Sequence, residues 1–212
     1  MTKLLPIDPA AVRWSEPQSD LGNRPLVVLM HGRGSHEHDL AGLVPLLPPE
    51  PVYASLRAPL PFAGGGYTWF ASGAPGAPDP KAADASTRGV LEWLEQVAQS
   101  GAVGALGFSQ GGAMAIQLMR HAPERFASYV NLAGFVIPGD APADARLGDL
   151  RQPVFWGRDP GDPMIPASAI ERTQAWLPLR STLTTGSYPG IGHSISRDEV
   201  DEVAEFLRAT LL

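Results

Sequence analysis

The sequence predicts an α/β fold in which a mostly parallel β-sheet carries helices on both faces. Short apolar runs alternate along the chain with longer segments whose apolar residues recur at helical spacing. The apolar runs are continuous rather than alternating, which is typical of parallel strands buried on both sides. At 212 residues the chain is long enough for one well-buried core, so we expect a single domain over residues 1–212.

The expected strands are short, mostly apolar and bounded by turn-forming residues. The N-terminal segment 1–24 is ambiguous, and within it residues 12–15 are expected to form a short edge strand. The first clear strand, Leu26–Met30, is an unbroken apolar run that ends in His-Gly. Further strands are expected at Val52–Leu56, 103–106, Ser128–Leu132, 154–156 and Ser181–Ser187.

The expected helices carry an apolar stripe on one face. Residues 81–99 have such a stripe, and Ser100 with Gly101 is expected to end that helix. The last helix begins at Ser196, which should form a capping box with Glu199. Other helices are expected at 39–47, 110–119 and 167–177, and loops rich in glycine and proline at 61–80 and 135–152.

Charge and composition argue against several classes of partner. The net charge of −6 comes without a basic cluster, so we expect neither nucleic acid nor an anionic membrane as a partner. No apolar run is long enough to span a bilayer, and the first residues do not resemble a signal peptide, so the expected location is cytoplasmic. The absence of cysteine excludes disulfides, a thiol nucleophile and thiolate metal ligands.

The segment His-Glu-His-Asp at 36–39 has the residue types of a metal site. A metal site needs further ligands that converge on the ion, and the sequence offers none at a suitable spacing. We therefore expect a polar loop that leads into a helix, with no bound metal and no cofactor.

The most informative motif is Gly-Phe-Ser-Gln-Gly at 107–111, which has the pattern G-x-S-x-G. It lies between an expected strand and an expected helix, which is the context this motif requires on a sharp strand-to-helix turn. Such a turn exposes the hydroxyl of Ser109 above the sheet edge, with the first N–H groups of the helix beside it. The alternative is a plain tight turn, so Ser109 as a nucleophile depends on a base and an acid elsewhere.

Candidates for both follow later strands. His193 lies after the strand Ser181–Ser187, in a glycine-rich loop that could bring the imidazole to a neighbouring strand end. After the strand at 154–156 two acids compete, Asp159 and Asp162, and either could be a turn former beside proline. The order Ser, Asp, His along the chain is the one expected on an α/β-hydrolase sheet.

Acyl transfer at Ser109 would also need N–H donors for an oxyanion. One should be the backbone N–H of Gln110, which follows the nucleophile, and the other that of Arg33 in His-Gly-Arg-Gly, at the end of an earlier strand. The alternative for the second is a simple glycine turn. The aromatic residues Trp69 and Phe70 are candidates to line the substrate pocket, the alternative being that they pack at the domain edge.

These residues resemble the carboxylesterase/phospholipase family of α/β-hydrolases, which includes acyl-protein thioesterases and lysophospholipases. The resemblance implies an α/β-hydrolase fold, with Arg33 and Gln110 supplying the oxyanion donors. It also favours Asp162 over Asp159 as the acid, because Asp-Pro-Met-Ile-Pro is similar to the family's Asp-x-x-Val-Pro. Many members have a hydrophobic residue at the place of Arg33, whose guanidinium could favour acidic or polar leaving groups. The matching segments are 29–40, 56–59 with 69–70, 107–112, 155–166 and 192–194.

The sequence therefore predicts a serine hydrolase that cleaves small carboxylic esters of short to medium acyl chain. An acyl-protein thioesterase or a lysophospholipase with the same machinery is the alternative. A hydrolase-fold protein that only binds ligands is less favoured, because such relatives usually lose the nucleophile, the base or an oxyanion glycine. The connection at 135–152 is too short for a large lid domain, so an open site is expected.

Overall fold

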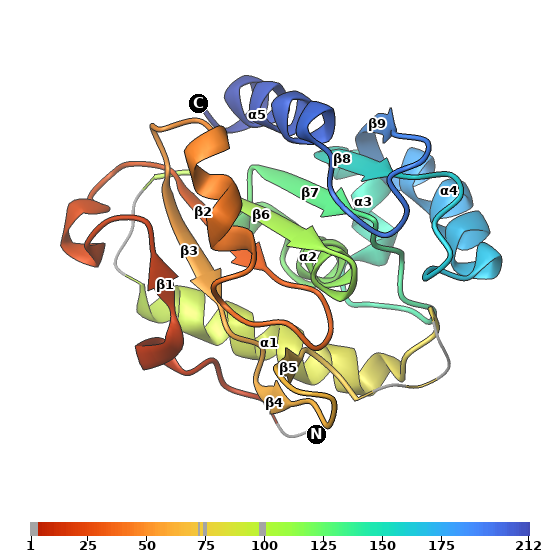
Figure 1. Ribbon diagram of the computed structural model, residues 1–212, viewed down its shortest axis with the longest axis horizontal. Coiled ribbons are helices and arrows are strands. Elements are labelled where there is room, and N and C mark those ends of the chain that lie inside the picture. The colour runs from red at the N-terminus through yellow and green to blue at the C-terminus, as the bar shows by residue number, and fades with distance from the viewer. Residues whose placement is uncertain (1–3, 72, 74–75, 98–100) are drawn as a thin grey trace.

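The computed structural model describes residues 4–71, 73, 76–97 and 101–212, and its centre is a seven-stranded sheet (Figure 1). All neighbouring strands are parallel except the first, which pairs antiparallel at one edge. In spatial order the strands are β1 (Arg13–Trp14), β3 (Val52–Leu56), β2 (Leu26–Met30), β6 (Val103–Phe108), β7 (Ser128–Leu132), β8 (Gln152–Arg158) and β9 (Ser181–Ser187).

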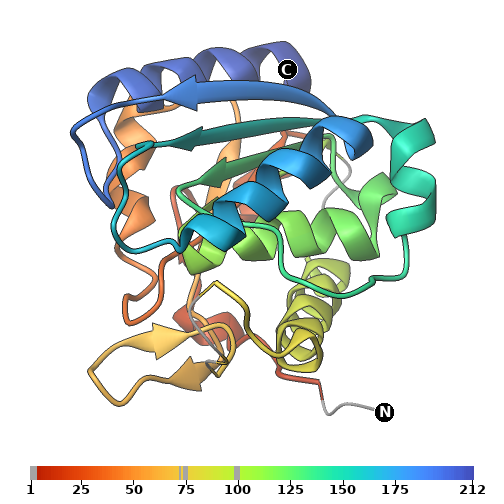
Figure 2. The ribbon, with the colours of Figure 1, turned by 90° about the vertical axis from the view of Figure 1, so that its right-hand side faces the viewer.

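Helices cover both faces of this sheet, which confirms the predicted fold class. On one face lie α1 (Pro80–Gln96), α2 (Gln110–His121), α3 (Asp144–Leu150) and α4 (Ala167–Arg180); on the other lies α5 (Arg197–Leu211) with the 3₁₀ helix η3 (Leu40–Leu46). Figure 2 shows α5, in dark blue, across the sheet from α1, α2 and α4. Alternate strand residues enter the two cores: Val28 faces α2, whereas Val27 and Leu29 face α5.

Four expected strands have the predicted bounds, and the edge strand at 12–15 is confirmed as β1. Strands β6 and β8 are longer than expected because backbone pairing continues through glycine, as at Gly107 opposite Asn131 and Gly157 opposite Gly186. The helix expected at 81–99 begins one residue earlier and ends at Gln96, while Ala98 and the expected stop at Ser100 lie outside the described residues.

Two segments expected as loops contain regular structure. A small two-stranded sheet, β4 (Leu60–Pro61) with β5 (Tyr67–Thr68), occupies part of 61–80. The connection 135–152 includes α3, whose Leu147 is fully buried; the described part of this connection contains no lid domain. The segment at 39–47 forms a 3₁₀ helix rather than an α-helix, and Pro45 inside it lacks the N–H that an α-helical bond requires. Within the described residues, no helix is both long and apolar enough to cross a membrane.

The other 3₁₀ helices of the described residues are η1 (Pro9–Ala11), η2 (Gln18–Asp20) and η4 (Pro123–Arg125).

The parallel arrangement matters for function because the carboxyl ends of β2, β6, β8 and β9 meet at one edge of the sheet. The segments that follow these strands carry the residues selected from the sequence.

Candidate active site

Ser109 lies on a strained turn between β6 and α2. Its backbone has φ +55° and ψ −114°, a conformation that residues other than glycine seldom adopt. The turn is tight enough that a Cβ at Gly107 would overlap the backbone of Gly111, and a Cβ at Gly111 would overlap the backbone of Met30. Both glycines of the motif are therefore sterically required, as a nucleophile elbow demands.

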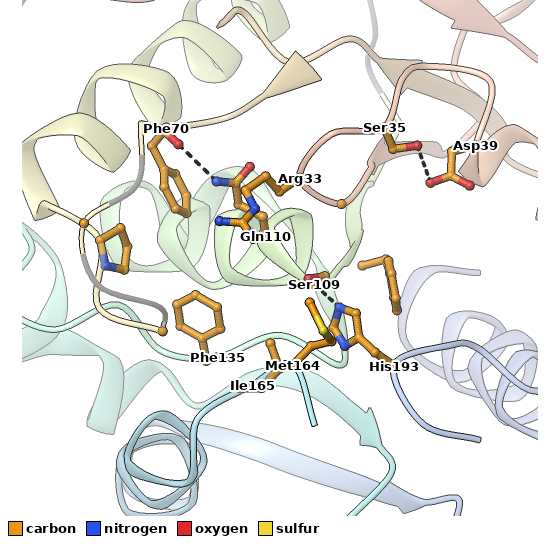
Figure 3. Close-up of a pocket in the computed structure, with 15 residues that line it drawn as sticks. Arg33, Ser35, Asp39, Phe70, Ser109, Gln110, Phe135, Met164, Ile165 and His193 are labelled. Atoms are coloured by element: carbon orange, nitrogen blue, oxygen red, sulfur yellow. Dashed lines mark hydrogen bonds between the residues drawn. The ribbon is translucent and has the colours of Figure 1, made fainter. Parts of the chain in front are cut away.

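The structure brings Ser109, His193 and Asp162 together in a continuous hydrogen-bonded chain (Figure 3 shows the first two). His193 Nε2 is 2.8 Å from Ser109 Oγ, and His193 Nδ1 is 2.6 Å from Asp162 Oδ2. Because a carboxylate only accepts, Nδ1 carries a proton toward Asp162 and leaves Nε2 free to accept from the serine hydroxyl. The Asp162 side chain is only 3% exposed, and its other oxygen accepts from the N–H of Met164 at 2.8 Å.

The competing acid, Asp159, does not contact His193. Its buried carboxylate accepts three backbone N–H groups instead, from Gly161 at 2.7 Å, Gly190 at 2.9 Å and Gly192 at 2.7 Å. These N–H groups, that of Gly161 most strongly, lower the pKa of Asp159. Of the two acids left open by the sequence, the structure places Asp162 on the imidazole and Asp159 in the loop backbone.

The peptide between Gly32 and Arg33 is held by the neighbouring His31. His31 Nδ1 donates to the carbonyl of Gly32 at 2.7 Å, and its Nε2 accepts from the N–H of Ala58 at 3.1 Å. Burial lowers the pKa of His31, which favours the neutral ring that this pattern requires. Since the carbonyl and N–H of a trans peptide point in opposite directions, the Arg33 N–H is directed away from His31.

Gly32 also lies close to the serine: a Cβ built on it would be 3.6 Å from the Cβ of Ser109. Arg33, Ser109 and Gln110 line the same cavity, with Gln110 as the first residue of α2. Both residues expected to supply oxyanion donors thus lie at the cavity beside Ser109, and the role of their N–H groups stays a prediction. Figure 3 shows the guanidinium of Arg33 pointing into this cavity.

The cavity has a volume of about 220 Å³ and is lined partly by apolar side chains. Phe70 lines it as predicted. Trp69 does not: it is fully buried behind the wall, where its indole N–H donates to the carbonyl of His31 at 2.8 Å. Sequence reasoning missed several lining residues, although Met164 and Ile165 lie in the motif Asp-Pro-Met-Ile-Pro. The large apolar ones among them are Phe108, Phe135, Met164 and Ile165.

The side chain of Gln110 anchors this wall. Its Oε1 accepts from the N–H of Trp69 at 2.9 Å and from the hydroxyl of Thr68 at 3.0 Å, and its Nε2 donates to the carbonyl of Phe70 at 3.1 Å. The side chain is buried, and these contacts engage both the oxygen and the nitrogen of its amide. Gln110 therefore contributes its backbone to the space beside Ser109 and its side chain to the shape of the pocket.

The described residues contain no group of three or more His, Cys, Asp or Glu side chains arranged to hold a metal ion. In the 36–39 segment Glu37 is bound by Arg57 at 2.7 and 2.5 Å, which lowers the pKa of Glu37 to about 2. His38 accepts from Arg13 at 3.2 Å. These side chains serve ion pairs and hydrogen bonds of the loop.

The chain is similar to esterases and thioesterases in sequence and structure. The model of the Phospholipase/Carboxylesterase family matches residues 80–211. Acyl-protein thioesterase 1 of Saccharomyces cerevisiae is 28% identical over 109 residues, 50% of this chain and 48% of that protein, so the match spans about half the length of that relative. A probable carboxylesterase SOBER1-like protein of Arabidopsis thaliana is 24% identical over 215 residues, covering 93% and 77%.

Solved structures extend the likeness to nearly the whole fold. The Bacillus cereus carboxylesterase superposes with a TM-score of 0.79 at 21% identity, covering 93% of each chain. Esterase PE8 gives 0.77 at 24% identity, covering 95% of this chain and 99% of that one. These likenesses confirm the α/β-hydrolase fold expected from the motifs. The match to the family model covers more than half of this chain, and the chain therefore belongs to the phospholipase/carboxylesterase family.

Proposed function

We propose that the protein is a serine hydrolase that cleaves small carboxylic esters through an acyl-enzyme intermediate. The observation that carries the proposal is the unbroken contact from Ser109 through His193 to Asp162, with Ser109 and His193 lining a cavity. A hydroxyl, an imidazole and a buried carboxylate in this order form the arrangement that activates a serine for acyl transfer.

In the proposed reaction, His193 Nε2 takes the hydroxyl proton as Ser109 Oγ forms a bond to the acyl carbon. The carbonyl oxygen becomes an oxyanion that accepts from the N–H groups of Arg33 and Gln110. The bond to the leaving alkoxide then breaks, and the alcohol departs with the proton held on His193. Water repeats the sequence on the acyl-enzyme, which releases the acid and restores Ser109.

The cavity supports a preference for short to medium acyl chains. Its 220 Å³ would hold a small apolar group against Phe70, Phe135 and Ile165, and Met164 at the rim is 56% exposed. The Arg33 guanidinium supports a preference for leaving groups that carry acidic or polar substituents. An activity panel of esters graded by acyl length tests this range directly.

An acyl-protein thioesterase or lysophospholipase activity is the second candidate, because several relatives carry the thioesterase name. The same panel should include an S-acyl peptide and a long-chain lysophospholipid. Turnover of butyrate esters well above both supports the esterase proposal. Preferential cleavage of either long-chain substrate would replace it with the second candidate.

The sharpest test of catalysis as such is Ser109→Ala with p-nitrophenyl butyrate as substrate. Removal of the nucleophile should lower kcat by about 10⁴ or more. Equal slow rates for the variant and the unaltered protein would instead indicate a hydrolase-fold protein that only binds ligands.

A further inference from the structure

One carboxylate joins the two loops that carry Asp162 and His193. Asp159 Oδ1 accepts from Gly161 N at 2.7 Å, in the turn that leads to Asp162. Its Oδ2 accepts from Gly190 N at 2.9 Å and Gly192 N at 2.7 Å, in the loop that ends at His193. Asp159 is only 5% exposed, so water does not compete freely for these bonds.

The histidine loop has little else to hold its backbone. Gly190 and Gly192 have φ of +90° and +64°, and a Cβ built on either would meet nothing within 4 Å. Of the loop's side chains, Tyr188 at its start is buried in the core under α5, and Ile191 packs against that core. The preceding backbone bond of the described loop is that of Tyr188 N to Arg158 O at 3.1 Å. Two N–H groups aimed at one carboxylate oxygen therefore fix the backbone at Gly190 and Gly192, the two positions of the loop with the greatest conformational freedom.

We propose that Asp159 is a positioning residue, which holds His193 and Asp162 in register by binding backbone N–H groups of both their loops. The proposal rests on the proposed function, because positioning has meaning only if these groups react. Asp159 is not a second acid for the imidazole, since both of its oxygens already accept from N–H groups. The same N–H groups lower its pKa, which keeps the carboxylate ionised and purely accepting.

The test is Asp159→Asn. The amide retains one oxygen but turns an NH₂ group toward donors on one side, so one of the two loops is released. We expect kcat for p-nitrophenyl butyrate to fall about 10- to 100-fold with KM changed by less than about twofold, because displacement of a reacting group by about 1 Å has this effect on rate.

The matched control is Asp144→Asn. Asp144 also has a largely buried carboxylate, paired with Arg120 at 2.6 Å, but it lines no part of the cavity. This variant should lower Tm while it leaves kcat and KM for p-nitrophenyl butyrate unchanged. A merely structural role for Asp159 would give the same result in Asp159→Asn, and that result would overturn the proposal.

Amide hydrogen exchange in the unaltered protein gives a test that needs neither a variant nor turnover. The N–H groups of Gly190 and Gly192 should exchange at least about tenfold more slowly than unprotected amides, although Gly190 is exposed. Exchange at the unprotected rate would overturn the inference. Absence of turnover in the unaltered protein would count against the proposed function alone, because exchange is measured without substrate.

Discussion

Replacing Glu199 with glutamine should stabilise the protein at neutral and alkaline pH. Glu199 is only 1% exposed, and neither carboxylate oxygen makes a hydrogen bond of normal geometry within the described structure. Burial raises the pKa of Glu199 from 4.5 to about 7; the nearby Ser196 backbone offsets part of the rise and the charge of Glu202 adds to it. Gly157 leaves the space for this carboxyl group, since a Cβ there would overlap Oε1.

The sign of the effect follows from the two pKa values. The unfolded chain loses the Glu199 proton near pH 4.5, whereas the folded chain keeps it to about pH 7. Stability is therefore present in full below pH 4.5, is lost as pH rises to about 7, and stays reduced above that. Each pH unit between the unfolded and folded pKa values corresponds to about 1.36 kcal/mol, so the free energy of unfolding falls by about 3 kcal/mol in all.

The assay is unfolding by urea and by heat at about pH 5 and about pH 8. The glutamine side chain of Glu199→Gln is uncharged at both pH values. The free energy of unfolding of the variant minus that of the unaltered protein should therefore increase by up to about 3 kcal/mol from about pH 5 to about pH 8, which corresponds to roughly 6–12 °C in Tm. Glu205→Gln, at an exposed position of the same helix, is the control and should show no such change. A stability difference that is the same at both pH values would refute the reasoning.

Three further predictions concern the site. Asp162→Asn should lower kcat by up to about 10⁴, far more than Asp159→Asn, and the reverse order in steady-state kinetics would reassign the acid. Arg33→Met keeps the backbone N–H but removes the guanidinium. The ratio of kcat/KM for 4-carboxyphenyl butyrate to that for phenyl butyrate should fall by about 2- to 5-fold, and added salt should lower the same ratio in the unaltered protein. An unchanged ratio would show that the guanidinium does not select substrates. Gly111→Ala should lower the free energy of unfolding, measured with urea, by about 3 kcal/mol. Gly42→Ala is the control and should leave it nearly unchanged, because a Cβ there meets nothing within 4 Å.

Much of this fold could be predicted because many of its strands are short, mostly apolar segments bounded by clear turn residues. Leu26–Met30, an unbroken apolar run, has the predicted bounds for that reason. Helix α3 could not be predicted, because its seven residues are mostly polar or small. Tertiary contacts stabilise it, among them the burial of Leu147 and the pairing of Asp144 with Arg120. Those contacts come from distant parts of the chain.

The site, too, could be predicted from the sequence only in part. Ser109 and His193 stand out because each lies in a glycine-rich sequence after an expected strand, and the structure brings them together. The sequence could not separate Phe70 from Trp69 as a pocket residue, since the direction of each side chain depends on the distant Gln110. The predicted capping box is confirmed only in its Ser196 half. Ser196 Oγ accepts from Glu199 N at 3.1 Å, but the Glu199 carboxyl is buried without a hydrogen-bond partner among the described residues.

The three hydrogen bonds made by the Gln110 amide have a consequence for engineering. The cavity wall at residues 68–70 cannot be exchanged as an independent module, because it is hydrogen-bonded to the residue that immediately follows Ser109. A grafted segment would have to offer a carbonyl and an N–H where residues 70 and 69 now offer them. Rebuilding this wall should therefore alter the shape of the cavity and the turn at Ser109 together.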